Sequence, residues 1–166
     1  MTDTPSSAMN HSLAASASIM RDDSQARAIL RGTQRLLRAL NFESLSEVCL
    51  ANGRRADILA LGPNGEAWIV EIKSSIADFR ADQKWREYRD YCDALLFAVA
   101  PDFPADVLPA DAGLILADAY AGEIVRAPPR HPLGPARKKA LTLAFARTAA
   151  SRLHGQSDPG AGIAMD

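Results

Sequence analysis

Two short apolar segments joined by a glycine- and proline-containing turn set the strongest limit on how this chain folds. Residues 56–61 read ADILAL and residues 67–73 read AWIVEIK, and Gly62–Pro63–Asn64–Gly65 lies between them. Gly, Pro and Asn supply the backbone geometry that tight turns need, so the pattern predicts two strands of an antiparallel hairpin.

Charged residues inside these segments are expected to meet on one face of the hairpin. Strand side chains alternate between faces, so Glu71 and Lys73 point the same way. If Glu66 belongs to the turn, Asp57 lies directly opposite Glu71 and shares its face. A charge in a strand usually marks only the solvent face, but apolar residues on both sides of it are typical of strands covered on both faces. Buried carboxylates need a partner, so this group predicts a cation site more than a solvated face.

The residues around this hairpin resemble a known family. The Asp57, Glu71 and Lys73 spacing is similar to that of the PD-(D/E)XK nuclease-like superfamily. The neighbouring stretches EIKSS at 71–75 and DFRADQKW at 78–85 look like the MmcB family of bacterial DNA repair proteins, which is placed in that superfamily. The resemblance extends from about residue 24 to residue 153.

This resemblance implies a fold, a cofactor and a set of site residues. The fold is a restriction-endonuclease-like αβββαβ core. The cofactor is Mg²⁺, for which Mn²⁺ substitutes, held by Asp57, Glu71 and the main-chain carbonyl of Ile72. Asp57, Glu71 and Lys73 are the implied catalytic residues, with Lys73 orienting or deprotonating a water molecule and stabilising the charge that develops on the phosphate.

The order of apolar patterns along the chain agrees with that fold class. We expect an α/β protein with a mixed sheet flanked by helices, and extra C-terminal strands and a helix beyond the core. The expected helices cover Asp23 or Ser24 to Leu40, 77–91 with a break near Arg80, and 136–153, and the expected strands cover 44–51, 54–61, 67–73, 94–100, 113–117 and 123–127.

Composition limits the chain to one globular domain. It has 166 residues, 48% hydrophobic and 23% charged, with no apolar run of membrane-spanning length and no secretory signal pattern. Cys49 and Cys92 lie in apolar neighbourhoods, which predicts buried free thiols in a reducing cytoplasm. We expect residues 1–22 to form a disordered tail, 23–154 the nuclease-like domain and 155–166 a flexible tail.

Basic residues gather in two places that are candidates for nucleic-acid contact. The segment 126–152 has seven Lys or Arg and no acid, whereas the rest of the chain, with 12 basic and 20 acidic residues, carries −8. Such asymmetry suggests a polyanion partner through Arg137, Lys138 and Lys139, or a solvated basic face. The first helix carries an arginine stripe at 27, 31, 35 and 38, for which solvation is the preferred interpretation.

Three further residues have two open interpretations. RecB-like nucleases carry a Gln-x-x-x-Tyr pair after the E-x-K strand, but here Gln83 and Tyr88 are five residues apart, whereas Lys84 and Tyr88 share a helix face. Lys84 and Tyr88 are therefore candidate DNA contacts, against a surface lysine and a core aromatic. Glu47 either approaches the cation site or is an exposed structural acid.

The residues leave three functions open. The preferred function is a magnesium-dependent endo- or exonuclease that hydrolyses DNA in repair, with DNA and other DNA repair proteins as partners. The alternative is a catalytically silent DNA-binding or scaffold module of a repair complex, and the third is an RNA-directed hydrolase. Holding three charges together has no purpose in a pure scaffold, so the intact group favours activity.

Overall fold

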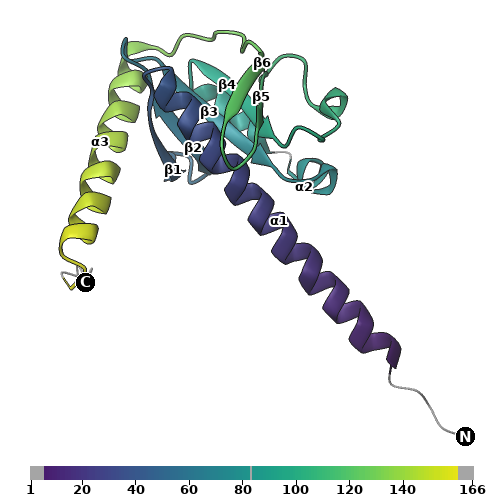
Figure 1. Cartoon of the computed structure of the whole chain (residues 1–166). Coiled ribbons are helices and arrows are strands. Elements are labelled where there is room, and N and C mark those ends of the chain that lie inside the picture. Colours follow the sequence, from purple (N-terminus) through teal and green to yellow (C-terminus); the bar gives the residue numbers. More distant parts are fainter. Residues whose placement is uncertain (1–5, 83, 161–166) are drawn as a thin grey trace, which may run out of the picture.

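One sheet of six strands, with helices on both faces, forms the core of the protein (Figure 1). The computed structural model describes residues 6–82 and 84–160. The helices are α1 (Ser6–Ala39), α2 (Ile76–Ala81), α3 (Pro135–Ser157) and the 3₁₀ helices η1 (Lys84–Tyr91) and η2 (Ala105–Val107). The strands are β1 (Glu43–Cys49), β2 (Arg55–Leu61), β3 (Ala67–Lys73), β4 (Ala94–Val99), β5 (Gly113–Ala117) and β6 (Gly122–Arg126).

The strands lie in the sheet in the order in which they occur in the chain. Strands β1, β2 and β3 form an antiparallel meander, β4 and β5 continue parallel to β3, and β6 pairs antiparallel with β5. The expected mixed sheet of an α/β protein is confirmed, and β3 and β5 match their predicted bounds residue for residue.

Both faces of the sheet are covered, as the apolar flanks of the charged residues predicted. Helix α1 packs on one face, where Ile29 and Leu37 contact a core that includes Val70 and Leu96. The other face is covered by η1 and α3, through a cluster that includes Trp85, Tyr88, Leu141, Ile69 and Phe97. Carboxylates on β2 and β3 therefore lie in strands that are covered by helices on both sides.

The first and last helices are longer than the sequence patterns predicted. Helix α1 begins at Ser6, not at Asp23 or Ser24, and so includes residues 6–22 of the expected tail. Ala is the strongest helix former, and this Ala-rich stretch contains no Gly or Pro to stop the helix, which extends beyond the sheet (Figure 1). Helix α3 runs to Ser157, which shortens the predicted C-terminal tail. Residues 1–5 and 161–166 lie outside the described residues.

The helix expected over residues 77–91 is two separate elements. The Ser75 side chain caps α2 by accepting a hydrogen bond from the Asp78 N–H at 3.2 Å. At the other end, the Asp82 side chain accepts the Lys84 N–H at 2.9 Å, and a new 3₁₀ helix begins there. An Asp that bonds to the backbone two residues ahead favours a turn over a continuing helix, which explains the break.

Asp93, which immediately precedes β4, fixes the connection between β6 and α3 to the sheet. Its carboxylate accepts the N–H groups of Ala67 and Leu133, both at 2.7 Å, and lies 3.1 Å from the Lys138 ammonium. Burial alone raises the pKa of Asp93, but these donors outweigh it and hold the pKa below its usual value. We refer to Asp93 and Lys138 with these two N–H groups as the Asp93 anchor.

Two further properties bear on the sequence predictions. Cys92 is buried as expected, but Cys49 is exposed, because it lies on the edge strand β1 and alternates with the buried Val48. Within 6–82 and 84–160, no helix combines the length and the apolar character needed to cross a membrane.

Candidate active site

A cavity of about 770 Å³ opens where β2 and β3 meet α1 and α2. Its lining comes from α1, from β1, β2 and β3, and from α2, η1 and the segment between them. The predicted residues Asp57, Glu71, Ile72 and Lys73 all line it. The structure therefore brings together on one cavity the three expected metal ligands and the expected catalytic lysine.

The carboxylates of Asp57 and Glu71 each accept a main-chain hydrogen bond across the hairpin. The β2–β3 register ends at the pair of Ile58 with Val70, and Asp57 and Glu71 are the residues next to that pair on the two strands. The Asp57 N–H donates to Glu71 Oε1 at 3.3 Å, and the Ile72 N–H donates to Asp57 Oδ2 at 2.8 Å. Each carboxylate is thus held by the main chain of the facing strand, which fixes both acids at the same end of the sheet.

The Lys73 ammonium lies between two carboxylates and is almost fully buried. Its Nζ atom is 4.0 Å from Glu71 Oε2 and 2.6 Å from Asp82 Oδ2, and the side chain is 4% exposed. Glu71 and Lys73 therefore share one face of β3, as their spacing predicted. Asp82 comes from the turn between α2 and η1, so this turn orients the lysine.

The electrostatics of the cavity favour an added positive charge. Burial, followed by the charge of Asp57, raises the pKa of Glu71 to about 8. Burial also raises the pKa of Asp57. Burial alone lowers the pKa of Lys73, but the hydrogen bond to Asp82 and nearby acids outweigh it and raise that pKa. One lysine therefore does not offset the repulsion of two buried carboxylates, and a bound cation would.

Glu47 forms the rim of the cavity on the edge strand β1. It has a left-handed backbone, with a φ of 53°, which non-glycine residues seldom adopt. Its side chain pairs with Arg55 at 2.5 Å. From α3, the Arg152 guanidinium donates to the main-chain oxygens of Ser46 at 2.6 Å and of Glu47 at 2.8 Å. Glu47 therefore does approach the site, and the end of α3 supports its unusual conformation.

Comparison with known proteins assigns the chain to a family. The model of the MmcB-like DNA repair proteins matches residues 13–160. The chain belongs to the MmcB-like DNA repair protein family. A solved protein of unknown function from Silicibacter pomeroyi is 48% identical, with a TM-score of 0.82, over 85% of this chain and 97% of that one. No curated protein matches the chain. The family likeness stated from the sequence is confirmed, and the family supports a role in DNA repair.

The two further candidates on the helix after β3 lie at the cavity, in different environments. Lys84 is exposed at its edge. Tyr88 is 4% exposed within the core, and its hydroxyl donates to the Arg55 carbonyl at 3.0 Å. Burial, followed by the charge of Glu71, raises the pKa of Tyr88. Tyr88 therefore supports the floor of the cavity from the core, as the core-aromatic interpretation expected, and Gln83 lies outside the described residues.

The basic residues at the start of α3 lie away from this cavity. Lys138 belongs to the Asp93 anchor, and Arg137 donates to the Asp90 carbonyl at 3.2 Å, with the Asp90 carboxylate 3.7 Å away. Lys139 is exposed. The structure does not place these three residues beside Asp57 and Glu71, and two of them make contacts that stabilise the fold.

Sequence reasoning did not place Asp82, Asp23 or Arg27 at the cation site, although all three line the cavity. Asp82 stood within the DFRADQKW stretch that carried the family resemblance, but no periodicity distinguished it. Arg27 belonged to the arginine stripe of the first helix, which was interpreted as solvated. Its place at the cavity depends on how α1 crosses the sheet, which residue spacing does not give.

Proposed function

We propose that this protein hydrolyses DNA phosphodiester bonds during repair, with Mg²⁺ or Mn²⁺ bound at Asp57 and Glu71. The observation that carries the proposal is the convergence of Asp57, Glu71 and Lys73 on one cavity, with the ammonium 4.0 Å from a Glu71 oxygen. Membership of a DNA repair family supports DNA as the substrate.

The donor chemistry of the cavity fits a hard divalent cation. Within the described residues, no three His, Cys, Asp or Glu side chains gather as a metal site. Mg²⁺ does not need three, because it prefers oxygen ligands and keeps several of its water molecules. Asp57 and Glu71 supply two carboxylates, and Ile72, which also lines the cavity, is proposed to add its carbonyl. A bound cation would supply Lewis acidity and a more acidic water molecule.

Lys73 is proposed to act as a fixed positive charge. The hydrogen bond to Asp82 and the nearby acids raise the pKa of Lys73, which favours a protonated amine over a base that removes a proton from water. The ammonium is instead held by Asp82 and Glu71 where it can donate hydrogen bonds to a phosphate oxygen. Fixed donors aimed at developing charge cost no reorganisation during the reaction, and this is a large contribution to catalysis.

Two exposed cations at the rim are proposed to hold the substrate. Arg27 and Lys84 both line the cavity and both are exposed. Neutralising phosphates releases counterions from DNA, and this favours binding in a way that depends on salt. These residues would hold the DNA backbone over Asp57 and Glu71 without recognising the base sequence.

A catalytically silent DNA-binding module is the second candidate. The observation that favours it is the 2.6 Å contact between Lys73 and Asp82, because a lysine neutralised by its own fold also serves as a structural ion pair. The two functions differ in what happens to bound DNA: the module retains it unchanged.

The deciding experiment compares cleavage and binding on the same DNA. Purified protein is incubated with labelled flapped, nicked, single-stranded and duplex DNA, and with RNA, in Mg²⁺ or Mn²⁺. Asp57→Asn and Lys73→Ala are expected to lose about 100-fold or more of the cleavage rate, as removal of one charge-stabilising donor does in other enzymes. Arg147→Gln, an exposed arginine on α3, serves as the control and keeps full activity.

A second measurement tests the cation site without turnover. Mn²⁺ binding followed by titration calorimetry or electron paramagnetic resonance should be lost in Asp57→Asn and kept in Arg147→Gln. Cation binding together with cleavage that both site variants lose supports the enzyme. Wild-type protein that binds every DNA and cleaves none establishes the module instead.

A further inference from the structure

We propose that one face of α1, together with Tyr120 in the β5–β6 turn, binds single-stranded DNA and leads it to the cavity. We call Arg27, Arg31 and Tyr120 the strand track. The inference rests on the proposed function for the direction of the track, because it ends at the proposed active site, but the binding surface can be tested without cleavage.

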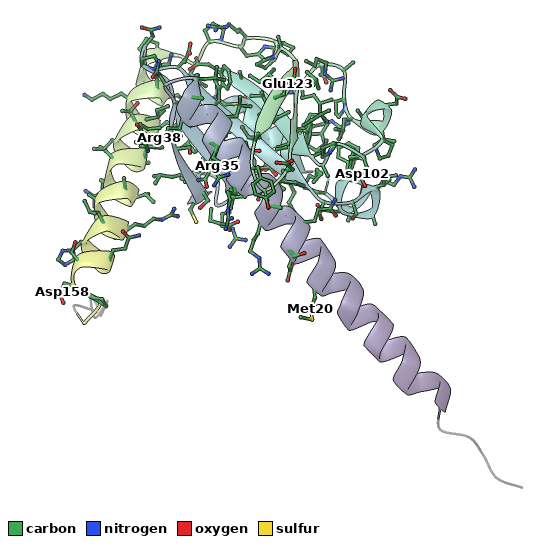
Figure 2. The ribbon with its side chains drawn as sticks, viewed as in Figure 1. Met20, Arg35, Arg38, Asp102, Glu123 and Asp158 are labelled. Carbon is green, nitrogen blue, oxygen red and sulfur yellow. The ribbon has the colours of Figure 1, made fainter. Side chains whose placement is uncertain are left out.

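Helix geometry connects the cavity to the turn. Arg27 lines the cavity, and Arg31 and Arg35 follow at intervals of four residues, so all three lie on one face about 6 Å apart along the axis. At the far end, Arg35 Nη1 donates to the main-chain oxygens of Ala119 at 3.2 Å and Tyr120 at 3.0 Å. One helix face therefore runs from Asp57 and Glu71 to Tyr120, and Figure 2 labels Arg35 where α1 crosses the sheet.

The β5–β6 turn is held against α1 at very short range. A Cβ atom on Gly32 would lie 2.1 Å from the Asp118 oxygen and 2.4 Å from the Ala121 oxygen. Glycine inside a helix costs about 1 kcal/mol relative to alanine. This close approach explains the glycine, because a larger residue would push the turn away from the helix.

Tyr120 is a large exposed aromatic side chain on a fixed backbone. It is 78% exposed. Asp118 Oδ1 accepts the N–H groups of Tyr120 at 2.7 Å and Ala121 at 2.9 Å, and Arg35 binds the carbonyl side of the same turn. The ring contributes little to the core, yet the main chain that carries it is tied at both its N–H and its carbonyl. Such a ring is suited to stacking on a base.

The charges along the track select the partner. Arg27 and Arg31 are exposed, and among the side chains that the structure describes neither forms an ion pair. Arg35 differs, because it fixes the turn. Two acids belong to the ends of this face: Asp118 is used by the turn, and Asp23 lines the cavity. Positive charges beside an aromatic platform match the phosphates and unpaired bases of a single strand, whereas bases in a duplex are already stacked.

The test measures DNA binding in EDTA, where cleavage does not occur. Fluorescence anisotropy follows a labelled 20-nucleotide oligo(dT) and a duplex of the same length with wild type, Tyr120→Ala, Tyr120→Phe and Arg31→Gln. We expect Tyr120→Ala to weaken oligo(dT) binding roughly 5- to 100-fold, as the loss of one stacked base does. Tyr120→Phe should bind like wild type, because phenylalanine keeps the π-face.

Salt dependence tests the phosphate contact. Arg31→Gln should lower the slope of log Kd against log salt for oligo(dT) by about 0.7, the contribution of one phosphate in a single strand. Arg147→Gln removes the same charge from α3 and should leave the slope unchanged. For Tyr120, the matched control is Val125→Ala, an exposed apolar residue on β6.

The failure of the track and the failure of the nuclease give different results. Tyr120→Ala that binds oligo(dT) like wild type overturns the track, even if the wild type cleaves DNA. An effect of Tyr120→Ala that is equal on oligo(dT) and duplex also overturns it. If Tyr120→Ala loses oligo(dT) binding and the wild type cleaves no DNA, the strand track is supported and the proposed nuclease activity is contradicted.

Discussion

Two buried carboxylate–lysine groups lie at opposite ends of the sheet, and their electrostatics are opposite. At the start of β4, the Asp93 anchor surrounds its acid with donors, and the pKa of Asp93 is lowered. At the end of β3, Glu71 lies beside a second acid, and burial with that charge raises its pKa to about 8. A carboxylate that serves the fold has enough donors within the fold, whereas Glu71 and Asp57 share one buried lysine with Asp82, and we propose that a bound cation completes this group.

The largest expected effect is on the Asp93 anchor. Asp93→Ala leaves the Lys138 ammonium and the Ala67 and Leu133 N–H groups without their acceptor, and each N–H group left unsatisfied costs about 1–3 kcal/mol. Urea unfolding measures the loss. The matched variant is Glu71→Gln, whose free energy of unfolding should equal or exceed that of wild type, since it removes a carboxyl group whose ionisation is opposed by burial and by Asp57. Equal destabilisation by both variants would erase the contrast between the two groups.

The pH dependence of stability gives the anchor a distinct signature. A lowered pKa means that the folded chain binds the Asp93 proton less readily than the unfolded chain, whose usual value is 3.8. The stabilisation is therefore fully present above pH 3.8 and is lost as the pH falls through the lower pKa of the folded state. Unfolding free energies of wild type and Asp93→Asn should differ at pH 6 and converge towards pH 3. A constant difference across that range would contradict the prediction.

Added cation should stabilise the cavity. A ligand that binds only the folded chain adds about 2.7 kcal/mol at 100 times its Kd. Thermal unfolding with and without Mn²⁺ should therefore show a higher Tm for wild type and no change for Asp57→Asn. Chelation with EDTA should reverse the shift. A wild-type Tm that does not change when Mn²⁺ is added would contradict the proposed cation site.

Asp82 is expected to position Lys73 without contacting the substrate. Asp82→Asn weakens the 2.6 Å contact that holds the ammonium, and misplacement of a reacting group by about 1 Å costs up to about 100-fold. We expect kcat to fall roughly 10- to 100-fold, less than in Lys73→Ala, with KM little changed. Asp82→Glu, which keeps the negative charge, should retain more of the wild-type kcat than Asp82→Asn. A wild-type kcat in Asp82→Asn would indicate that Asp82 only stabilises the turn.

The smallest effect separates two neighbouring basic residues on α3. The Arg137 and Asp90 side chains are 63% and 73% exposed, so Arg137→Gln should change stability by less than about 0.5 kcal/mol. Lys138, in the Asp93 anchor, is half-buried, and Lys138→Met should cost about 1–3 kcal/mol. Urea unfolding of the two variants measures both losses. Equal losses in free energy of unfolding would contradict the idea that burial makes Lys138 more important than Arg137.

The hairpin and its three charges were predictable because both depend on short periods in the sequence. The period of two places Glu71 and Lys73 on one face, and the turn length places Asp57 opposite Glu71. These relations are local, so a few residues fix them. The predicted sheet class followed from the same alternation and from the order of apolar runs.

The rest of the site depends on contacts between distant segments. Asp82 reaches Lys73 because α2 stops early, and the stop itself depends on one side chain that bonds the backbone ahead of it. Arg27 reaches the cavity because of the angle at which α1 crosses the sheet. Asp93 gives no sequence pattern either, since its partners Leu133 and Lys138 lie about forty residues further along the chain. Periodicity carries no information about such pairings.

The bonds from Arg152 to the rim of the cavity also affect the order in which the protein matures. Proteins are synthesised from the N-terminus, and domains fold as their residues become available. The sheet and α1 are complete before α3 exists, but the carbonyls of Ser46 and Glu47 gain their guanidinium only when residue 152 has been added. A nascent chain therefore contains the acids of its cavity before it contains the arginine that braces Glu47 beside them.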